Sequence, residues 1–290
     1  LFDGRTPRDI EVLNEAFIDY LNYGGFPETV FEKRVRHEMS RYVANDIIDK
    51  VLLRDLPSLY GISDPQELNR LFTVIAYNTG LEVNIDELSK QFQVAKNTIK
   101  KFLEYLEAAF LIRRIYRVDQ NARRFKKQTH FKIYLANPSL RSALFGAVDA
   151  DDPAMGQLAE TAIVSQFSHS VKFGSLHYAR WKAGRNTMEV DLVSLDQHSQ
   201  RVSFAVEIKW SNRSPLNPRQ ELVGLLDFCK KNLEAGQVST RSVEKTSDVD
   251  GIGIYYAPIS VDCWSVGRFF VQGKLEKGSH PLAGTLLKEP

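Results

Sequence analysis

Residues 189–210 read EVDLVSLDQHSQRVSFAVEIKW, two apolar runs on either side of a polar loop. This pattern predicts two neighbouring strands joined by a hairpin, Met188–Leu195 and Val202–Trp210. Glu207 and Lys209 lie two apart on the second strand, so their side chains point to the same face of the sheet. Burying a carboxylate or an ammonium is costly unless the group is paired or holds a metal. The stretch therefore predicts a charged site built into a sheet.

The acidic residues around this stretch suit a divalent cation. Magnesium prefers hard oxygen ligands and keeps several of its waters, so two or three carboxylates are enough. Asp191 and Glu207, one on each strand, are the predicted ligands of Mg²⁺ or Mn²⁺, and Glu160 on a preceding helix is a third ligand, directly or through water. Glu189 shares the strand face of Asp191 and is an alternative to it. Lys209 would orient the water that attacks a phosphodiester or stabilise the pentavalent transition state.

The same residues also admit an ordinary structural interpretation, in which Glu207 and Lys209 pair on an exposed sheet edge. A Glu-x-Lys tripeptide is a weak signal by its spacing alone. The order of the predicted elements strengthens the metal-site hypothesis, because it fits an α/β domain in which helices enclose a small mixed sheet. Those elements are a helix over 157–167, strands over 176–181, 188–195 and 202–210, a helix over 219–230, a polar stretch over 237–250 and a strand over 251–256.

Upstream of this domain, the sequence predicts a winged helix. A short helix, a tight turn and a longer helix form the helix-turn-helix pattern, and a β-hairpin after them completes a winged helix. The predicted elements are helices over Pro65–Tyr77, Asn84–Phe92 and Ala95–Phe110, and strands over Leu111–Val118 and Phe131–Leu135.

Basic residues cluster on this predicted winged helix. The hairpin and its flanks, from Arg113 to Lys132, hold eight basic residues against one acid, Asp119. Such a surface neutralises phosphates and predicts salt-dependent DNA binding, with Lys96 and Asn97 near base edges. A protein-docking role is the alternative, because a charged face is often only solvated. The predicted DNA-contacting residues are Lys96, Asn97, Lys100, Lys101, Arg123, Arg124, Lys126 and Lys127.

The chain before the winged helix reads as a helical segment. Gly24 to Glu28 breaks one helix sharply, because Gly-Gly permits unusual dihedral angles and Pro27 restricts Phe26. A second helix is predicted over 31–56, where Pro57 would end it. A stretch rich in small and acidic residues, 146–153, marks a domain boundary. The predicted parts are a helical segment over 1–64, a winged helix over 65–145 and an α/β domain over 154–275.

The overall composition indicates how a partner would be recognised and in which compartment we expect the protein. The chain has 290 residues and a net charge of +2, so a charged partner must be recognised by local clusters. No apolar run approaches the roughly 20 residues of a membrane helix, and no membrane partner is expected. Two cysteines without metal-ligand spacing are typical of a reducing, cytoplasmic setting. Leu1 is not an initiator methionine and no signal segment follows it, so we expect a fragment of a longer protein, whose oligomeric state stays open.

At Glu160, Asp191, Glu207 and Lys209 the sequence resembles the PD-(D/E)xK superfamily of restriction-endonuclease-like proteins. The motifs of that superfamily run as a helix glutamate, an acidic residue on one strand and Glu/Asp-x-Lys on the next. The resemblance implies a restriction-endonuclease-like α/β domain over 154–275. It also implies that these four residues are catalytic and that the reaction is Mg²⁺-dependent cleavage of DNA.

Two positions depart from the pattern of that superfamily. Val190 stands where a proline usually precedes the acidic residue. Gln220 lies on the following helix, where some RecB-like members carry a glutamine of the catalytic site. The tyrosine that those members place four residues later is replaced here by Gly224.

A second resemblance covers most of the chain, from Gly24 to Lys209. The series is similar to the uncharacterised C-terminal region that follows the ATP-binding domain in a family of prokaryotic AAA-type ATPases. It implies that ATP is bound only by an N-terminal ATPase domain missing from this sequence. The expected function is a DNA-binding, nuclease-like module of such an ATPase; the alternative is an inactive DNA- or protein-binding module that regulates it. The matching segments are GGFPE at 24–28, IYL at 133–135, GQLAE at 156–160, EVD at 189–191 and VEIK at 206–209.

Overall fold

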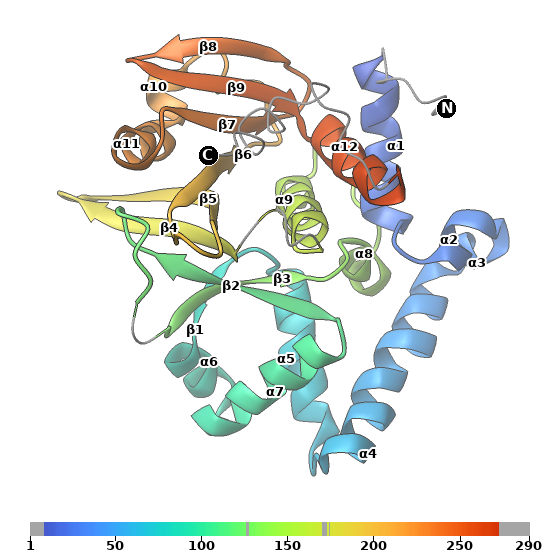
Figure 1. The fold of residues 1–290 in the computed structure, drawn as a ribbon. Coiled ribbons are helices and arrows are strands. Elements are labelled where there is room, and N and C mark those ends of the chain that lie inside the picture. The colour runs from blue at the N-terminus through green and yellow to red at the C-terminus, as the bar shows by residue number, and fades with distance from the viewer. Residues whose placement is uncertain (1–8, 126–127, 170–172, 174, 273–290) are drawn as a thin grey trace. The chain divides into compact units, whose positions relative to one another are not determined.

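A computed structural model describes residues 9–125, 128–169, 173 and 175–272 (Figure 1). The chain divides into two compact units, each assembled from separated stretches. We call Phe17–Ile115 with Gln128–Ser165 the helical unit, and Leu1–Ala16 with Tyr116–Lys127 and Gln166–Pro290 the sheet unit. The predicted α/β class is confirmed, whereas the division into three consecutive domains stays a prediction.

The helical unit contains the predicted three helices and hairpin, with one strand more. A strand of three residues, β1, lies between α5 and α6 and pairs antiparallel with β3. The sequence analysis missed it because three residues are too few to show the alternation of a strand. In strand order β3 lies between β1 and β2. The elements are α5 (Pro65–Tyr77), β1 (Glu82–Asn84), α6 (Ile85–Phe92), α7 (Lys96–Ala108), β2 (Ile112–Val118) and β3 (His130–Leu135).

Further helices complete this unit. The predicted corner at Gly24–Glu28 is confirmed, because α1 ends at Tyr23 and α2 begins at Pro27. α8 falls between β3 and the predicted boundary and is absent from the sequence-based prediction. The helices are the second half of α1 (Ile10–Tyr23), whose first half belongs to the sheet unit, and α2 (Pro27–Phe31), α3 (Lys33–His37), α4 (Leu56–Tyr60), α8 (Ser139–Phe145) and α9 (Ala154–Phe167).

The helical run predicted over 31–56 is present, but it is not one regular α-helix. It is interrupted at the extended residue Glu32, and after α3 it continues through wide π-helical turns over Ser40–Asp49 and Val51–Asp55. Pro57 does not end the segment but lies in the first turn of α4, where a missing N–H costs no hydrogen bond. Gly61 ends α4 instead, in a left-handed conformation (φ +64°) that glycine adopts without strain.

The sheet unit is built on a mixed sheet. Its order is the end of β2, then β4, β5, β6, β7, β9 and β8. Neighbours pair antiparallel at β4–β5, β5–β6 and β8–β9, and parallel at β2–β4, β6–β7 and β7–β9. The strands are β4 (Ser175–Ala183), β5 (Asn186–Leu195), β6 (Val202–Ile208), β7 (Ala235–Thr240), β8 (Lys245–Val249) and β9 (Ile252–Pro258).

Helices cover both faces of this sheet (Figure 1). Val238 of β7 is buried in one apolar cluster with Leu225 of α11 (Val223–Asn232). The residues on either side of it, Gln237 and Ser239, instead donate hydrogen bonds to Asp262 of α12 (Ile259–Gln272). Because successive side chains of a strand point to opposite faces, α11 and α12 lie on opposite sides of the sheet.

The prediction of a small sheet is wrong, because part of the chain read as a loop forms strands. The polar stretch 237–250 contains most of β7 and all of β8. Gln237, Ser239 and Thr240 are buried there and hydrogen-bonded by their side chains. A strand whose buried face is polar lacks the hydrophobic alternation by which strands are recognised. The helix predicted over 219–230 is also broken at Leu222, into α10 (Pro218–Glu221) and α11.

Gly224 allows α11 to approach β5 closely. A Cβ atom at this position would lie 2.2 Å from the carbonyl oxygen of Glu189. No side chain can occupy that space without a shift of the helix or the strand. The tyrosine expected at this position from the superfamily resemblance therefore does not fit the observed packing.

Candidate functional site

Asp191 lies at an irregularity of β5. Between His177 and Ala179 of β4 the register with β5 shifts, so that one residue of β4 faces two residues of β5, Asp191 and Leu192. An extra residue of this kind is a β-bulge, which bends the strand and redirects a side chain. The bulge gives Asp191 a position that an uninterrupted strand would not provide.

The carboxylate of Asp191 accepts a hydrogen bond that a main-chain carbonyl of the neighbouring strand would otherwise accept. Its Oδ2 accepts the backbone N–H of Ile208 at 2.9 Å, while the regular pairing of β5 with β6 ends at Leu192 and Val206. A buried backbone N–H needs an acceptor, and the side chain supplies one where the neighbouring strand no longer does. Ile208 is the middle residue of the Glu-x-Lys tripeptide, so this bond fixes Asp191 beside it.

Glu207 and Lys209 form an ion pair on a central strand. Lys209 Nζ lies 2.7 Å from Glu207 Oε1, and the backbone N–H of Lys209 donates to Ser239 of β7 at 2.8 Å. β6 has β5 on one side and β7 on the other, and Glu207 is only 8% exposed. The alternative of a pair on an exposed edge is therefore wrong. The Lys209 side chain is 33% exposed and reaches the surface.

Glu160 belongs to the helical unit, where it has local partners. Its Oε1 accepts from Lys132 Nζ at 3.1 Å and from the hydroxyl of Tyr134. The Lys132 side chain is 5% exposed, and Tyr134 is fully buried. These contacts give the Glu160 carboxylate a structural role in its own unit, and its role as a metal ligand stays a prediction.

Glu189, the alternative to Asp191, is engaged by the neighbouring strand. Arg180 is its partner in the β4–β5 register, and the two side chains form an ion pair at 3.5 Å. Asp191 instead turns toward β6 through its bond to Ile208. Of the two acidic residues, Asp191 is the one held beside Glu207 and Lys209.

The carboxylates of Asp191, in the middle of β5, and Glu207, near the end of β6, are of the type that a divalent cation binds together with its substrate. Asp191 and Glu207 offer hard carboxylate oxygens from neighbouring strands, and Mg²⁺ is often bound by one or two carboxylates together with phosphate oxygens. Within the described ranges, no group of three or more His, Cys, Asp or Glu side chains is placed to hold a metal. A cation bound there would neutralise the negative charge that develops on a phosphate during the reaction.

Two residues that the sequence analysis did not assign lie next to Lys209. Trp210 follows β6 and Arg241 follows β7, with the guanidinium 5.8 Å from the centre of the indole ring. The backbone N–H of Arg241 also donates to Ser211 at 3.3 Å. The carboxyl ends of parallel strands commonly bind ligands in α/β sheets. Arg241 had no local signal, because its neighbours read as a polar loop.

The residues predicted to contact DNA are distributed over both units. One of them is already neutralised: Lys96 Nζ lies 2.8 Å from Asp86 Oδ1, and this bond lowers the pKa of Asp86. Lys126 and Lys127 lie outside the described residues. The exposed members are Lys96, Asn97, Lys100 and Lys101 at the start of α7, in the helical unit, and Arg123 and Arg124 after β2, in the sheet unit.

Other basic residues of the predicted hairpin have structural partners. Arg114 forms an ion pair with Glu107, and Lys132 binds Glu160. Arg117 donates from Nε to the carbonyl of Arg180 at 2.9 Å, within the sheet unit. The sequence count of eight basic residues therefore overstates the positive charge available to a nucleic acid.

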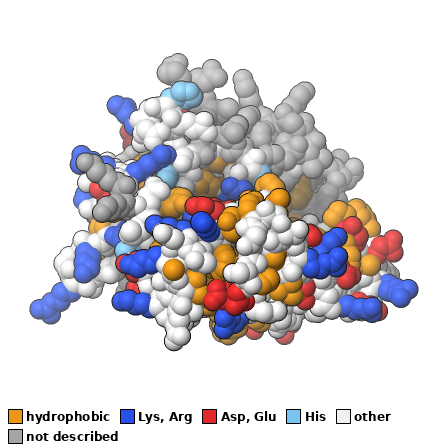
Figure 2. All heavy atoms as spheres, turned by 90° about the horizontal axis from the view of Figure 1, so that it is seen from below, with side chains coloured by type: hydrophobic (Ala, Val, Ile, Leu, Met, Phe, Trp, Pro, Cys, Tyr) orange, Lys and Arg blue, Asp and Glu red, His pale blue; other side chains and the backbone are white. Residues whose placement is uncertain are grey.

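Charges of both signs share the surface drawn in Figure 2. Lys and Arg side chains are interspersed there with Asp and Glu and with hydrophobic side chains, and they do not gather into one uniform patch. Within the described part of the chain, no helix is long and apolar enough to cross a membrane.

Comparisons with known proteins identify no activity. A family model described as a domain of unknown function (DUF8612) matches residues 14–151, which end before Glu160, Asp191, Glu207 and Lys209. An uncharacterised protein of Haemophilus influenzae is 23% identical over 250 residues, which cover 84% of this chain. The chain spans 57% of the length of that relative. No solved structure matches.

Proposed function

We propose that this chain is a DNA-binding, nuclease-like module with a Mg²⁺-dependent site for phosphodiester cleavage. One observation carries the proposal: Asp191 accepts the N–H of Ile208 at 2.9 Å, beside the 2.7 Å pair of Glu207 and Lys209. This bond holds Asp191 next to the Glu-x-Lys tripeptide, where β5 and β6 stop pairing.

Each of these residues has a distinct role under the proposal. Asp191 and Glu207 hold Mg²⁺ or Mn²⁺ against a DNA phosphate, while the assignment of Glu160 as a third ligand stays a prediction from the sequence. Lys209, with its exposed ammonium, orients the attacking water and offsets the negative charge that develops in the transition state. Moving Lys209 away from Glu207 is the local change that substrate binding would require.

The substrate and the larger protein are also part of the proposal. Exposed Lys100, Lys101, Arg123 and Arg124 offer cations to DNA phosphates, and Arg241 beside Trp210 offers a cation and an aromatic face near Lys209. An N-terminal AAA-type ATPase domain would bind ATP in the full-length cytoplasmic protein. The greater length of the Haemophilus influenzae relative supports a longer protein.

A second candidate is a binding module without catalysis that regulates such an ATPase. The direct pair between Lys209 and Glu207 favours it, because the lysine already neutralises the carboxylate that would bind the metal. Glu160 is likewise engaged by Lys132 and Tyr134. A protein with this function would bind DNA or a protein partner but would have no need of Mg²⁺.

A cleavage assay separates the two candidates. Linear, nicked and single-stranded DNA are incubated with the wild-type chain and Mg²⁺ or Mn²⁺, and products are resolved on gels. Lys209→Ala and Glu207→Gln are expected to lower the cleavage rate by about 100-fold or more, in the range seen when a transition-state stabiliser is removed. Lys230→Ala and Glu234→Gln, at exposed positions of the same unit, are the matched controls and should retain the wild-type rate.

Binding measurements complete this test. DNA affinity with and without Mn²⁺ is measured for the same variants by fluorescence anisotropy. Absence of cleavage by the wild type, or equal cleavage by Lys209→Ala, contradicts the enzymatic proposal. Retained, salt-sensitive DNA binding in that case supports the non-catalytic module.

A further inference from the structure

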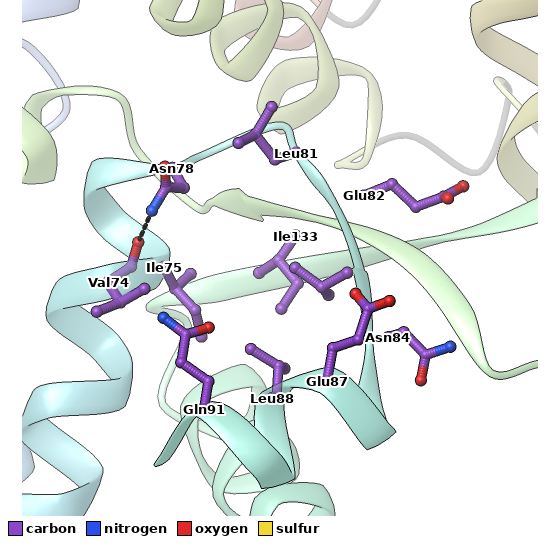
Figure 3. A pocket seen from close by; sticks show the side chains of 11 residues that line it. Val74, Ile75, Asn78, Leu81, Glu82, Asn84, Glu87, Leu88, Gln91 and Ile133 are labelled. Carbon is purple, nitrogen blue, oxygen red and sulfur yellow. Dashed lines mark hydrogen bonds between the residues drawn. The ribbon is translucent and has the colours of Figure 1, made fainter.

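A small cavity opens in the helical unit on the side of α6 (Figure 3). Its volume is about 210 Å³, and its walls come from α5, β1, α6 and β3. The buried side chains Ile75, Leu88 and Ile133 form its floor together with Val83. Ligand pockets for whole small molecules usually enclose about 300–1,000 Å³, so this cavity suits one apolar side chain.

The opening of the cavity is acidic. Figure 3 shows Glu87 and Gln91 rising from α6 on either side of Ile133. Glu82 also lines the cavity, but on β1 it alternates with Val83, and its carboxylate points away from the apolar floor in Figure 3. None of the lining residues is basic. An apolar floor beside the Glu87 carboxylate is complementary to an apolar group that carries a cation next to it.

The amide side chains in the cavity wall are hydrogen-bonded to other residues of the helical unit. Asn78 donates from Nδ2 to the carbonyl of Val74 at 2.9 Å. Asn84 caps α6, accepting the N–H of Asp86 at 2.8 Å, and its Nδ2 lies 3.1 Å from His130 Nε2. Because these amides already have hydrogen-bond partners within the helical unit, we expect a ligand to be recognised by the apolar floor and by the acidic side chain at the opening.

One wall of the cavity is the edge of a sheet. β1 stands at the end of the strand order, pairs with β3 on one side, and has no strand of the described chain on the other. An unpaired strand edge can add an extended segment through main-chain hydrogen bonds, while a neighbouring pocket takes an alternate side chain. Leu81, 47% exposed just before β1, adds apolar surface at the same place.

We propose that this cavity docks an extended segment of a partner protein, in which one leucine-sized side chain is flanked by lysine or arginine. The apolar side chain fills the cavity, and a flanking cation lies against Glu87. DNA is excluded as an occupant by the sign of the charge. The proposal is independent of the site at Glu207.

Peptide binding to the 290-residue chain tests this inference. The probes are the blocked tripeptides Lys-Leu-Lys, Glu-Leu-Glu and Lys-Ser-Lys, and binding is followed by NMR of isotope-labelled Ile, Leu and Val methyl groups. Lys-Leu-Lys should shift the methyl signals of Ile75, Leu88 and Ile133, and the other two probes should not. Glu87→Lys should weaken this binding about fivefold or more, because an attractive charge pair becomes repulsive.

Two further variants keep the test decisive. Glu104→Lys makes the same charge change at an exposed position of α7 outside the cavity and should bind Lys-Leu-Lys like the wild type. Leu81→Ser, at an exposed position of the cavity wall, should also weaken binding. Equal response to Glu-Leu-Glu, equal loss in Glu104→Lys, or shifts confined to α7 would overturn the inference. Methyl shifts that follow protein concentration without peptide would assign the cavity to a second copy of this chain instead.

Discussion

The two buried glutamate–lysine pairs of this protein differ in what surrounds them. In the helical unit, Glu160 binds Lys132 and Tyr134, and the lysine side chain is 5% exposed. In the sheet unit, Glu207 binds Lys209, whose side chain is 33% exposed, and Asp191 adds a second carboxylate at Ile208. The lysine of the first pair is enclosed, whereas the lysine of the second pair reaches the surface.

This difference distinguishes an ion pair that stabilises the fold from one that a ligand can reach. Enclosing an ion pair is tolerated when the charges balance and further hydrogen bonds satisfy them. Charged groups that solvent reaches can instead exchange their partners for a cation or an anionic substrate, as groups at functional sites do. The predictions below test whether the two pairs differ in this way.

The largest expected effect is on the enclosed pair. Glu160→Gln removes the carboxylate partner of Lys132, whose side chain is 5% exposed, and should lower the free energy of unfolding by about 3–5 kcal/mol. Glu207→Gln should cost only about 1 kcal/mol, because the ammonium of Lys209 that is left behind is partly solvated. Urea unfolding measures both. The double variant Lys132→Met/Glu160→Gln is the control and should recover most of the loss; equal costs for Glu160→Gln and Glu207→Gln would remove the distinction.

Acid should weaken the strand that lies opposite Asp191. Burial lowers the pKa of His177 on β4 to about 4 from the ordinary 6.5, although a backbone bond to Tyr116 opposes this shift. The folded protein therefore keeps the ring neutral, while the unfolded chain takes up a proton near pH 6.5. The stabilisation is complete above that pH and is lost as the pH falls toward 4, on the order of 3 kcal/mol in all.

The measurement is the free energy of unfolding between pH 7.5 and pH 5. His177→Gln should flatten the acid slope, even where it lowers stability at neutral pH. His198→Gln, at an exposed position in the β5–β6 loop of the same unit, is the matched control. A slope that is unchanged in His177→Gln would assign the acid sensitivity to other groups.

A side chain placed between α11 and β5 should displace the strand that carries Asp191. Gly224→Ala places a Cβ atom 2.2 Å from the carbonyl of Glu189, two residues before Asp191. Overpacking of this kind costs about 1–3 kcal/mol and should displace β5. Thermal unfolding measures the cost. Gly267→Ala in α12, with no atom within 4 Å of the added Cβ, should instead raise stability by up to about 1 kcal/mol, and a similar loss in both variants would contradict the packing argument.

The smallest effects are expected on the exposed start of α7. Lys100→Ala should lower the salt dependence of DNA binding by about one ion per complex, the contribution of one phosphate contact. Lys96→Ala should change it less, because Asp86 already pairs with that lysine. Affinity at several salt concentrations measures both slopes. An unchanged slope in Lys100→Ala would point away from DNA contact by α7.

Much of the fold could be predicted from the sequence, because several elements carry their own signals. α5 coincides with the predicted helix over 65–77, and the bounds of β4, β5 and β6 differ from the prediction by at most two residues. β7 and β8 could not be recognised, since their side chains are polar and find partners only in the folded protein, such as Asp262 for Ser239. The helical character of 31–56 could be predicted, but its π-helical turns could not, because such turns preserve a helical sequence pattern.

The candidate site, like the fold, could be predicted from the sequence only in part. The spacing of Glu207 and Lys209 on one strand face predicts their proximity, and the 2.7 Å pair confirms it. The role of Asp191 as acceptor of the Ile208 N–H depends on a bulge that no local pattern announces. Trp210 and Arg241 come together because β6 and β7 run parallel across a long connection in the chain.

By itself the sequence determined that this is an α/β protein and that one strand carries a buried carboxylate with a lysine beside it. Both follow from local periodicity, which the chain expresses within a few residues. Only the tertiary structure decided that this strand is central, that Asp191 bonds to it, and that the similar pair at Glu160 is enclosed. Those features depend on which distant segments pack together, and the free energy of that packing is shared by many residues far apart in the chain.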